Sequence, residues 1–157
     1  MAYKNILFVC EGNKCRSPMA EGILRKMLEL GRNQKIALSS AGIAAIAAYP
    51  GKAARNAILV LREMGIDISN HITKQLDEEM IKQNDLILAM TREIKEEIIE
   101  MHPESKAKIY TLGEFAGYRD FDIRDPIGRD IEVYREVAYE IKMLLERALD
   151  KINCEKI

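Results

Sequence analysis

The sequence predicts an α/β fold: a single three-layer domain in which a four-stranded parallel sheet carries helices on both faces. Short, continuously apolar runs of strand length, such as residues 6–9 and 86–89, alternate along the chain with helical patterns. Strands without polar positions are typical of parallel sheets whose two faces are both buried. The chain has 157 residues, 48% of them hydrophobic, so we expect residues 1–157 to form one domain with a substantial core.

Each element has its own signal in the sequence. Strands are expected over residues 4–9, 35–39, 85–89 and 107–111. Helices are expected over residues 17–30, 53–64, 75–83, 91–101 and 130–151. Gly31 and Gly65 end the first two helices, since glycine commonly follows the last helical turn. The last helix is predicted from apolar residues near helical spacing, namely Ile131, Val133, Tyr134, Val137, Ile141, Leu144, Leu145 and Ala148.

Two stretches interrupt this alternation. Residues 40–52 are expected to form a loop, in which Tyr49 either lines a binding site or packs against the core. Residues 112–129 contain three glycines and three aromatic residues and are expected to be mostly irregular. Long irregular segments in a compact domain are usually functional, so we expect this one to bring Asp125 over a site.

Composition narrows the classes of function. A net charge of −1 argues against a nucleic-acid-binding surface. The apolar stretches are much shorter than a membrane span, and the N-terminal region lacks the pattern of a signal peptide. Three cysteines, two of them in one loop, do not make a disulfide framework. We therefore expect a cytoplasmic protein whose partners are neither nucleic acids nor membranes.

The most informative stretch joins the first strand to the first helix and reads Cys10-Glu11-Gly12-Asn13-Lys14-Cys15-Arg16-Ser17-Pro18. In such a loop, consecutive backbone N–H groups point into one small space at the positive end of a helix dipole, which favours an anion. A thiol in this setting becomes a good nucleophile because positive charge and the helix N-terminus favour its ionised form. The planar fork of Arg16 can hold two phosphate oxygens, which a lysine could not do. The loop therefore predicts covalent phosphoryl transfer, with Cys10 as the candidate nucleophile.

The remaining loop residues suit its tight geometry. Gly12 allows a tight turn or a positive φ, and Asn13 tolerates the left-handed conformation better than most residues. Ser17 either donates a hydrogen bond to the thiolate of Cys10 or helps to cap the helix. Pro18 fits the first helical turn, where its missing N–H is not needed.

These motifs resemble the active-site loop of the low-molecular-weight protein tyrosine phosphatases, in particular of their bacterial branch. Later blocks of the chain also resemble that family, in the same order: residues 39–42, 65–71, 85–90 and the Asp-Pro motif at 125–128. The resemblance covers nearly the whole chain. It implies a single phosphatase domain that hydrolyses a phosphorylated protein or peptide through a cysteinyl-phosphate, without metal or other cofactor.

The resemblance also implies a role for each matching residue. Cys10 matches the nucleophile, Arg16 the arginine that binds phosphate in the transition state, and Asp125 the general acid that later activates water. A supporting hydrogen-bond network is implied for Asn13, Ser17, Ser40 and His71. Phosphate binding is implied for Glu11, Gly12, Asn13, Lys14, Cys15, Arg16 and Ser17.

Alternatives exist for the two cysteines of the loop. Cys10 could be an inert buried thiol, or Cys10 and Cys15 could be two zinc ligands. The other candidate zinc ligands, His71, His102 and Cys154, are scattered singly. The two loop thiols could also form a reversible disulfide that protects Cys10 from over-oxidation, unless Cys15 simply supplies a backbone N–H. A nucleotide-binding loop is improbable because the Gly-Lys-Ser/Thr ending is missing.

Asp125 and the histidines have ordinary structural explanations as well. Asp-Pro is a common turn starter, and Asp120, Asp122 and Asp130 are nearby competitors for the acid role. His71 could be a half-buried histidine bonded to the backbone, which differs little from a supporting role. His102 precedes Pro103 and is expected to be a solvated cap at a helix end.

The rim of the loop leaves the substrate open. Tyrosine-directed members of the family usually have apolar residues where this chain has Glu11 and Lys14, and often aromatic residues directly after the Asp-Pro. Here Ile127 and Gly128 follow instead, a pattern that resembles the bacterial protein arginine phosphatases. Phosphotyrosine is placed first as the usual substrate of the family, and phosphoarginine is the alternative. Arsenate reduction, for which Cys154 is the one further thiol, and a non-catalytic phosphoprotein-binding module are the remaining readings.

Overall fold

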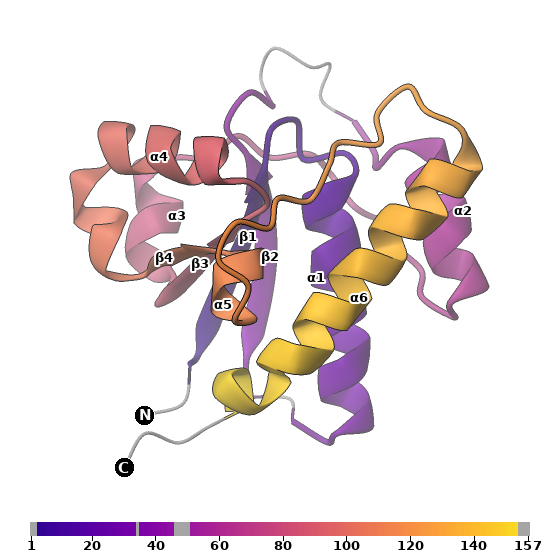
Figure 1. The fold of residues 1–157 in the computed structure, drawn as a ribbon, viewed down its shortest axis with the longest axis horizontal. Coiled ribbons are helices and arrows are strands. Elements are labelled where there is room, and N and C mark those ends of the chain that lie inside the picture. Colours follow the sequence, from indigo (N-terminus) through magenta and orange to yellow (C-terminus); the bar gives the residue numbers. More distant parts are fainter. Residues whose placement is uncertain (1–2, 34, 46–50, 154–157) are drawn as a thin grey trace.

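The computed structural model describes residues 3–33, 35–45 and 51–153. A parallel sheet of four strands lies at its centre, in the order β2-β1-β3-β4 (Figure 1). The strands are β1 (Asn5–Cys10), β2 (Ala37–Gly42), β3 (Leu86–Ala89) and β4 (Ile109–Thr111). The helices are α1 (Arg16–Leu30), α2 (Arg55–Glu63), α3 (Glu78–Gln83), α4 (Arg92–Met101), the 3₁₀ helix η1 (Pro103–Ala107), α5 (Leu112–Phe115) and α6 (Ile131–Asn153).

Two hydrophobic cores lie on opposite faces of the sheet. Because successive strand residues point to opposite faces, Ile6 and Phe8 belong to the core shared with α1, α2, α5 and α6. Leu7 and Val9 belong to the other core, which α3 and α4 cover. In Figure 1, α3 and α4 lie on one side of the sheet and α1 and α6 on the other. The predicted α/β class, with helices on both faces of a four-stranded parallel sheet, is confirmed.

The topology decides where a ligand can bind. Strand β1 pairs with β2 on one side and with β3 on the other. The strand order therefore reverses at the carboxyl end of β1. Open α/β sheets bind ligands at such a switch point. The loop that begins at Cys10 therefore occupies the ligand-binding position of the fold.

Two expectations from the sequence need correction, and one short helix was not predicted. Strand β2 runs to Gly42 rather than ending at residue 39, because Ser40, Ala41 and Gly42 pair with β1. Helix α5 forms inside the stretch that was expected to be irregular, since Thr111 and Glu114 make a reciprocal capping box. The short helix η1 begins with Pro103, which suits a first helical turn.

The rest of the irregular stretch matches the expectation. Residues 116–130 form coil and turns that run across the carboxyl ends of the strands to α6 (Figure 1). Tyr49, considered as a wall of the site, falls outside the described residues.

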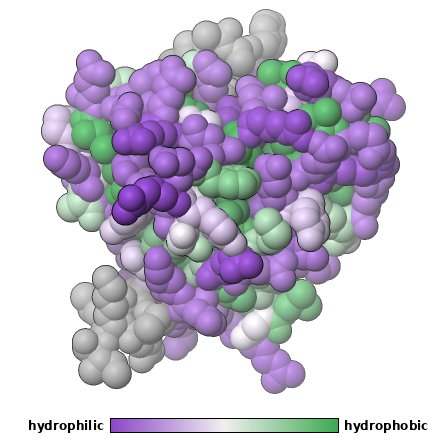
Figure 2. Space-filling view, viewed as in Figure 1, coloured by the Kyte–Doolittle hydropathy of each residue, from purple (hydrophilic) through white to green (hydrophobic). Residues whose placement is uncertain are grey.

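The face seen in Figure 2 is mostly hydrophilic. Within the described ranges we find no helix long and apolar enough for a membrane span.

Candidate active site

The thiol of Cys10 lies at the floor of a loop that closes around it. Cys10 ends β1 and is 2% exposed. Its Sγ is 2.9 Å from the Oγ of Ser17 and accepts the backbone N–H of Asn13 at 3.2 Å. Ser17 is thus occupied with the thiol rather than with capping, and α1 begins without a side-chain cap. A hydroxyl and a backbone N–H of one loop therefore converge on one sulfur atom.

Asn13 holds the shape of this loop. Its φ of 58° is left-handed, so the positive φ considered for Gly12 falls on Asn13 instead. The fully buried side chain donates from Nδ2 to the Oγ of Ser17 at 2.8 Å and to the Oγ of Ser40 at 3.0 Å. Its Oδ1 accepts the N–H of Lys74 at 2.9 Å. One amide therefore ties the loop to β2 and to the segment after α2.

His71 supports the same loop from behind. Its Nε2 lies 2.8 Å from the carbonyl oxygen of Asn13. A carbonyl only accepts hydrogen bonds, so Nε2 carries the proton. Burial lowers the pKa of His71, which keeps the ring neutral and Nδ1 unprotonated near neutral pH. The residues implied as a supporting network are thus brought together around Asn13.

Arg16 connects the loop to the coil that carries Asp125. The guanidinium is almost fully buried and donates from Nη1 to the carbonyl of Ile123 at 2.8 Å. Its Nη2 lies 3.5 Å from the Oδ2 of Asp125. Its Nε is buried and has no hydrogen-bond partner among the described residues. Buried donors are normally satisfied, so a free Nε at this place suits an anion that completes the site.

A pocket of about 170 Å³ opens above the thiol. Its walls are Cys10, Glu11, Gly12, Lys14, Cys15, Arg16, Asp125 and Ile127. Glu11 and Ile127 are exposed at the rim, whereas Lys14 is half-buried. The pocket is small and carries both signs of charge, which suits a phosphoryl group better than a large apolar ligand.

Gly42 explains how the loop can rest on β2. A Cβ at this position would come within 2.6 Å of the carbonyl oxygen of Glu11 and 2.9 Å of the nitrogen of Asn13. The backbone groups of Ile43 and Ala44 then donate to the carbonyls of Cys10 and Glu11. Close approach of backbone to backbone therefore requires glycine at the end of β2.

The competing aspartates lie elsewhere. Asp120 pairs with Arg92, and Asp122 accepts the backbone N–H of Arg92. The carboxylate of Asp130 accepts the N–H of Val133 at the start of α6. Of the four aspartates considered, Asp125 is the one that lines the pocket with Cys10 and Arg16.

Cys15 has a partner that was not foreseen. Its Sγ lies 3.5 Å from the hydroxyl of Tyr134, which α6 brings beneath the loop. Burial raises the pKa of Cys15 to about 11, and burial also raises the pKa of Tyr134. Both groups therefore stay protonated near neutral pH. The sequence placed Tyr134 on the buried face of its helix, but nothing in the pattern linked it to Cys15.

Two further predicted features are placed by the structure. His102 caps the end of α4 but is half-buried and lies 3.7 Å from Glu104, so the expectation of a solvated cap was wrong. Across the described ranges, no group of three or more histidine, cysteine, aspartate and glutamate side chains is arranged around a metal position. The carbonyl of Ile123, which orients Arg16, has no signal in the sequence because any residue supplies a carbonyl.

Comparison with known proteins agrees with this geometry. The sequence profile described as "Low molecular weight phosphotyrosine protein phosphatase" matches residues 5–156. A protein-arginine-phosphatase of Geobacillus stearothermophilus is 41% identical over 156 residues, which cover 99% of this chain and 100% of the relative. An arsenate reductase of Staphylococcus aureus is 33% identical over 147 residues, 94% of this chain and 97% of that protein.

A solved structure extends the likeness to three dimensions. The low molecular weight protein tyrosine phosphatase from T. tengcongensis superimposes with a TM-score of 0.87 at 40% identity. The match covers 94% of this chain and 98% of that one. The chain therefore belongs to the low molecular weight phosphotyrosine protein phosphatase family.

Proposed function

We propose that this protein is a metal-independent phosphoprotein phosphatase that works through a cysteinyl-phosphate on Cys10. The observation that carries the proposal is the convergence on one small pocket of a buried thiol, an unpartnered guanidinium N–H and a carboxylate. These are the groups that a phosphoryl transfer through a thiol requires, in Cys10, Arg16 and Asp125.

In the first step the thiolate of Cys10 attacks phosphorus. The S–P bond forms as the bond from phosphorus to the leaving group breaks, and Asp125 gives its proton to that group. The loop N–H groups and Arg16 face the phosphoryl oxygens, over which charge spreads in the transition state. Ser17 and the N–H of Asn13 stabilise the thiolate beforehand and again when it is released.

In the second step water hydrolyses the intermediate. Asp125, now ionised, takes a proton from the water as its oxygen attacks phosphorus. The S–P bond breaks, the thiolate of Cys10 returns and inorganic phosphate leaves. Asp125 ends the cycle protonated, ready for the next substrate.

For the substrate we place phosphoarginine ahead of phosphotyrosine, which reverses the order suggested by sequence alone. The described walls of the pocket contain no aromatic ring, and Ile127 is the one large aliphatic side chain among them. A phenyl ring gains little from such walls, whereas the N–H groups of a phosphoguanidinium can donate to Glu11 and Asp125. The 41% identical relative named protein-arginine-phosphatase supports this order.

Phosphotyrosine remains the second candidate because of the family description and the 40% identical tyrosine phosphatase structure. Paired peptides that differ only in the phosphorylated side chain decide between the two. We expect kcat/KM to be at least about tenfold higher for the phosphoarginine peptide, since one added charge-assisted hydrogen bond has about this effect. A ratio in favour of the phosphotyrosine peptide would restore the earlier order.

Of the two other readings, the binding module is tested with the same enzyme preparation. Arsenate reduction needs further thiols to pass the disulfide onward, and Cys154 lies outside the described residues. Hydrolysis of p-nitrophenyl phosphate without added metal separates an enzyme from a binding module.

We propose a cytoplasmic location and phosphorylated proteins or peptides as the partners.

A further inference from the structure

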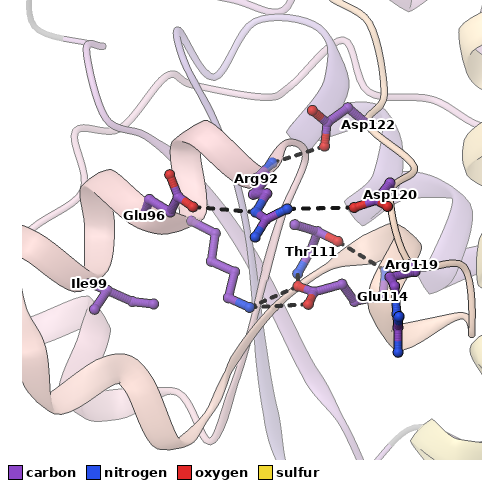
Figure 3. Close-up of a pocket in the computed structure, with 9 residues that line it drawn as sticks. Arg92, Glu96, Ile99, Thr111, Glu114, Arg119, Asp120 and Asp122 are labelled. Carbon is purple, nitrogen blue, oxygen red and sulfur yellow. Dashed lines mark hydrogen bonds and ion pairs between the residues drawn. The ribbon is translucent and has the colours of Figure 1, made fainter.

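A second pocket, of about 480 Å³, lies beside the coil that carries the acid (Figure 3). It is lined by charged residues from α4, from α5 and from this coil. Several of its charges are paired: Lys95 lies 2.9 Å from Glu114, and Arg92 lies 3.5 Å from Asp120. The residues that line this pocket also join the coil to α4.

Asp122 forms one such wall and fastens the coil to α4. Its Oδ1 accepts the backbone N–H of Arg92 at 2.9 Å (Figure 3). Arg92 is the first residue of α4, so this N–H has no partner within the helix. Thr91 satisfies the N–H of Ile94 in the same turn. The carboxylate of Asp122 thus caps a second donor at the positive end of the helix dipole.

The residues on either side of Asp122 are fixed as well. Ile123 donates its N–H to the carbonyl of Met90 at 3.0 Å and accepts from Arg16 through its own carbonyl. The carbonyl of Phe121 lies so close to Gly113 that a Cβ there would overlap it. Asp122 and Ile123 are therefore hydrogen-bonded, and Phe121 lies close against Gly113, just before the chain reaches Asp125.

We propose that Asp122 is a positioning residue that sets where Asp125 stands over Cys10. The proposal rests on the proposed function, because Asp125 acts as an acid only in that reaction. Asp122 itself does not line the pocket around the thiol. When Asp122 no longer accepts from Arg92, this part of the coil loses one of its three hydrogen bonds, with Arg92, Met90 and Arg16. A displacement of about 1 Å costs up to about 10²-fold in rate when a reacting group is moved.

The signature of such a role is its dependence on the leaving group. Phenyl phosphate releases a strongly basic phenolate and needs the proton of Asp125, whereas p-nitrophenyl phosphate releases a weakly basic one and needs it far less. A merely structural loss lowers kcat/KM for both esters alike. A misplaced acid lowers it selectively for phenyl phosphate.

Position 92 allows a matched pair of variants. Arg92→Pro removes the backbone N–H that Asp122 accepts, and proline is well tolerated at the first helical position. The preceding Thr91 has φ −137° and ψ 161°, which is the extended backbone that proline requires before it. Arg92→Ala keeps the N–H. Both variants lose the ion pairs of the Arg92 side chain. A difference in activity between them therefore reports on the hydrogen bond to Asp122.

For phenyl phosphate we expect kcat/KM of Arg92→Pro to be about tenfold lower than that of Arg92→Ala. For p-nitrophenyl phosphate we expect kcat/KM of the two variants to differ by less than about threefold. Asp122→Ala should give the same pattern, and Asp122→Asn, which keeps an acceptor oxygen, should recover most of the loss. Equal values for Arg92→Pro and Arg92→Ala, or equal losses on both esters, would overturn the role of Asp122. Rapid quenching of the wild-type enzyme separates the two proposals, since failure to trap phosphocysteine would contradict the proposed function itself.

Discussion

The loop around Cys10 and the coil that carries Asp125 meet in one pocket but are held in different ways. The loop has a network of its own, because Asn13 and Ser17 bond to one another and to the thiol and are fully buried, and Ser40 and His71 support it from other segments. The coil is held from outside, by Met90, Arg92 and Arg16. The Asp125 side chain remains 35% exposed.

This difference separates two parts of the chemistry. The loop around Cys10 has a buried hydrogen-bond network of its own besides its contacts with distant segments, whereas the proposed proton donor is placed by contacts that its coil makes with other segments. Variants in the loop should therefore change phosphate binding and nucleophilic attack, and variants in the coil should change proton transfer while phosphate still binds.

Replacing the nucleophile tests the loop directly. Cys10→Ser should lower kcat by at least about 10⁴-fold, because a serine hydroxyl in this loop has no base to ionise it. Binding of inorganic phosphate should persist, since Arg16 and the loop N–H groups remain. Turnover of p-nitrophenyl phosphate and calorimetric titration with phosphate measure the two effects, and residual turnover near the wild-type rate would contradict the assignment.

Replacing the acid tests the coil. Asp125→Asn should lower kcat/KM for phenyl phosphate by about 10²- to 10³-fold, with a smaller loss for p-nitrophenyl phosphate. The competitive inhibition constant of phosphate should change little. Asp120→Asn is the matched control, because Asp120 lies in the same coil and pairs with Arg92 away from the thiol. Equal losses in the two variants would remove the special role of Asp125.

Adding one methyl group under the loop should separate packing from chemistry. Gly42→Ala places a Cβ 2.6 Å from the carbonyl of Glu11, so the loop has to move and stability should fall by about 1–3 kcal/mol. Gly12→Ala is the control for stability, since a Cβ there meets no atom within 4 Å. Chemical denaturation of both variants compares them, and equal stabilities would show that the loop does not depend on contact with Gly42.

The smallest effect concerns the support of the loop by His71. Burial lowers the pKa of His71, so the unfolded chain binds a proton more readily than the folded protein. Stability from the neutral ring is full above the ordinary histidine pKa of about 6.5 and is lost as pH falls below it. The wild type should therefore lose more Tm between pH 7.5 and pH 5.5 than His71→Gln does. Equal losses in the two proteins would contradict this coupling.

The same division explains what could be predicted from the sequence. The sheet and the cradle depend on local signals, such as the apolar run before Cys10 and the glycine and asparagine that follow it, and the fold class was predicted correctly. Ser40 and Gly42 were expected in a loop because small and polar residues obscure a strand that packs against backbone. Helix α5 was missed although its Thr-x-x-Glu capping signature is visible, because Gly113 argues against a helix.

The contacts that place the coil could not be predicted in this way. Its hydrogen bonds with Met90, Arg92 and Arg16 use backbone groups on one side of each bond, and backbone groups carry no signature in the sequence. Asp122 was weighed as a competing acid, not as a residue that holds the coil. Such roles follow from three-dimensional proximity alone.

Tyr134, which contacts Cys15 from α6, has a consequence for biosynthesis. Cys10 and its loop leave the ribosome before Asp125 and the helix beneath the loop. A nascent chain that stops before α6 has its thiol but lacks the floor of the cradle. We therefore expect the catalytic site to become complete only after α6 has been synthesised.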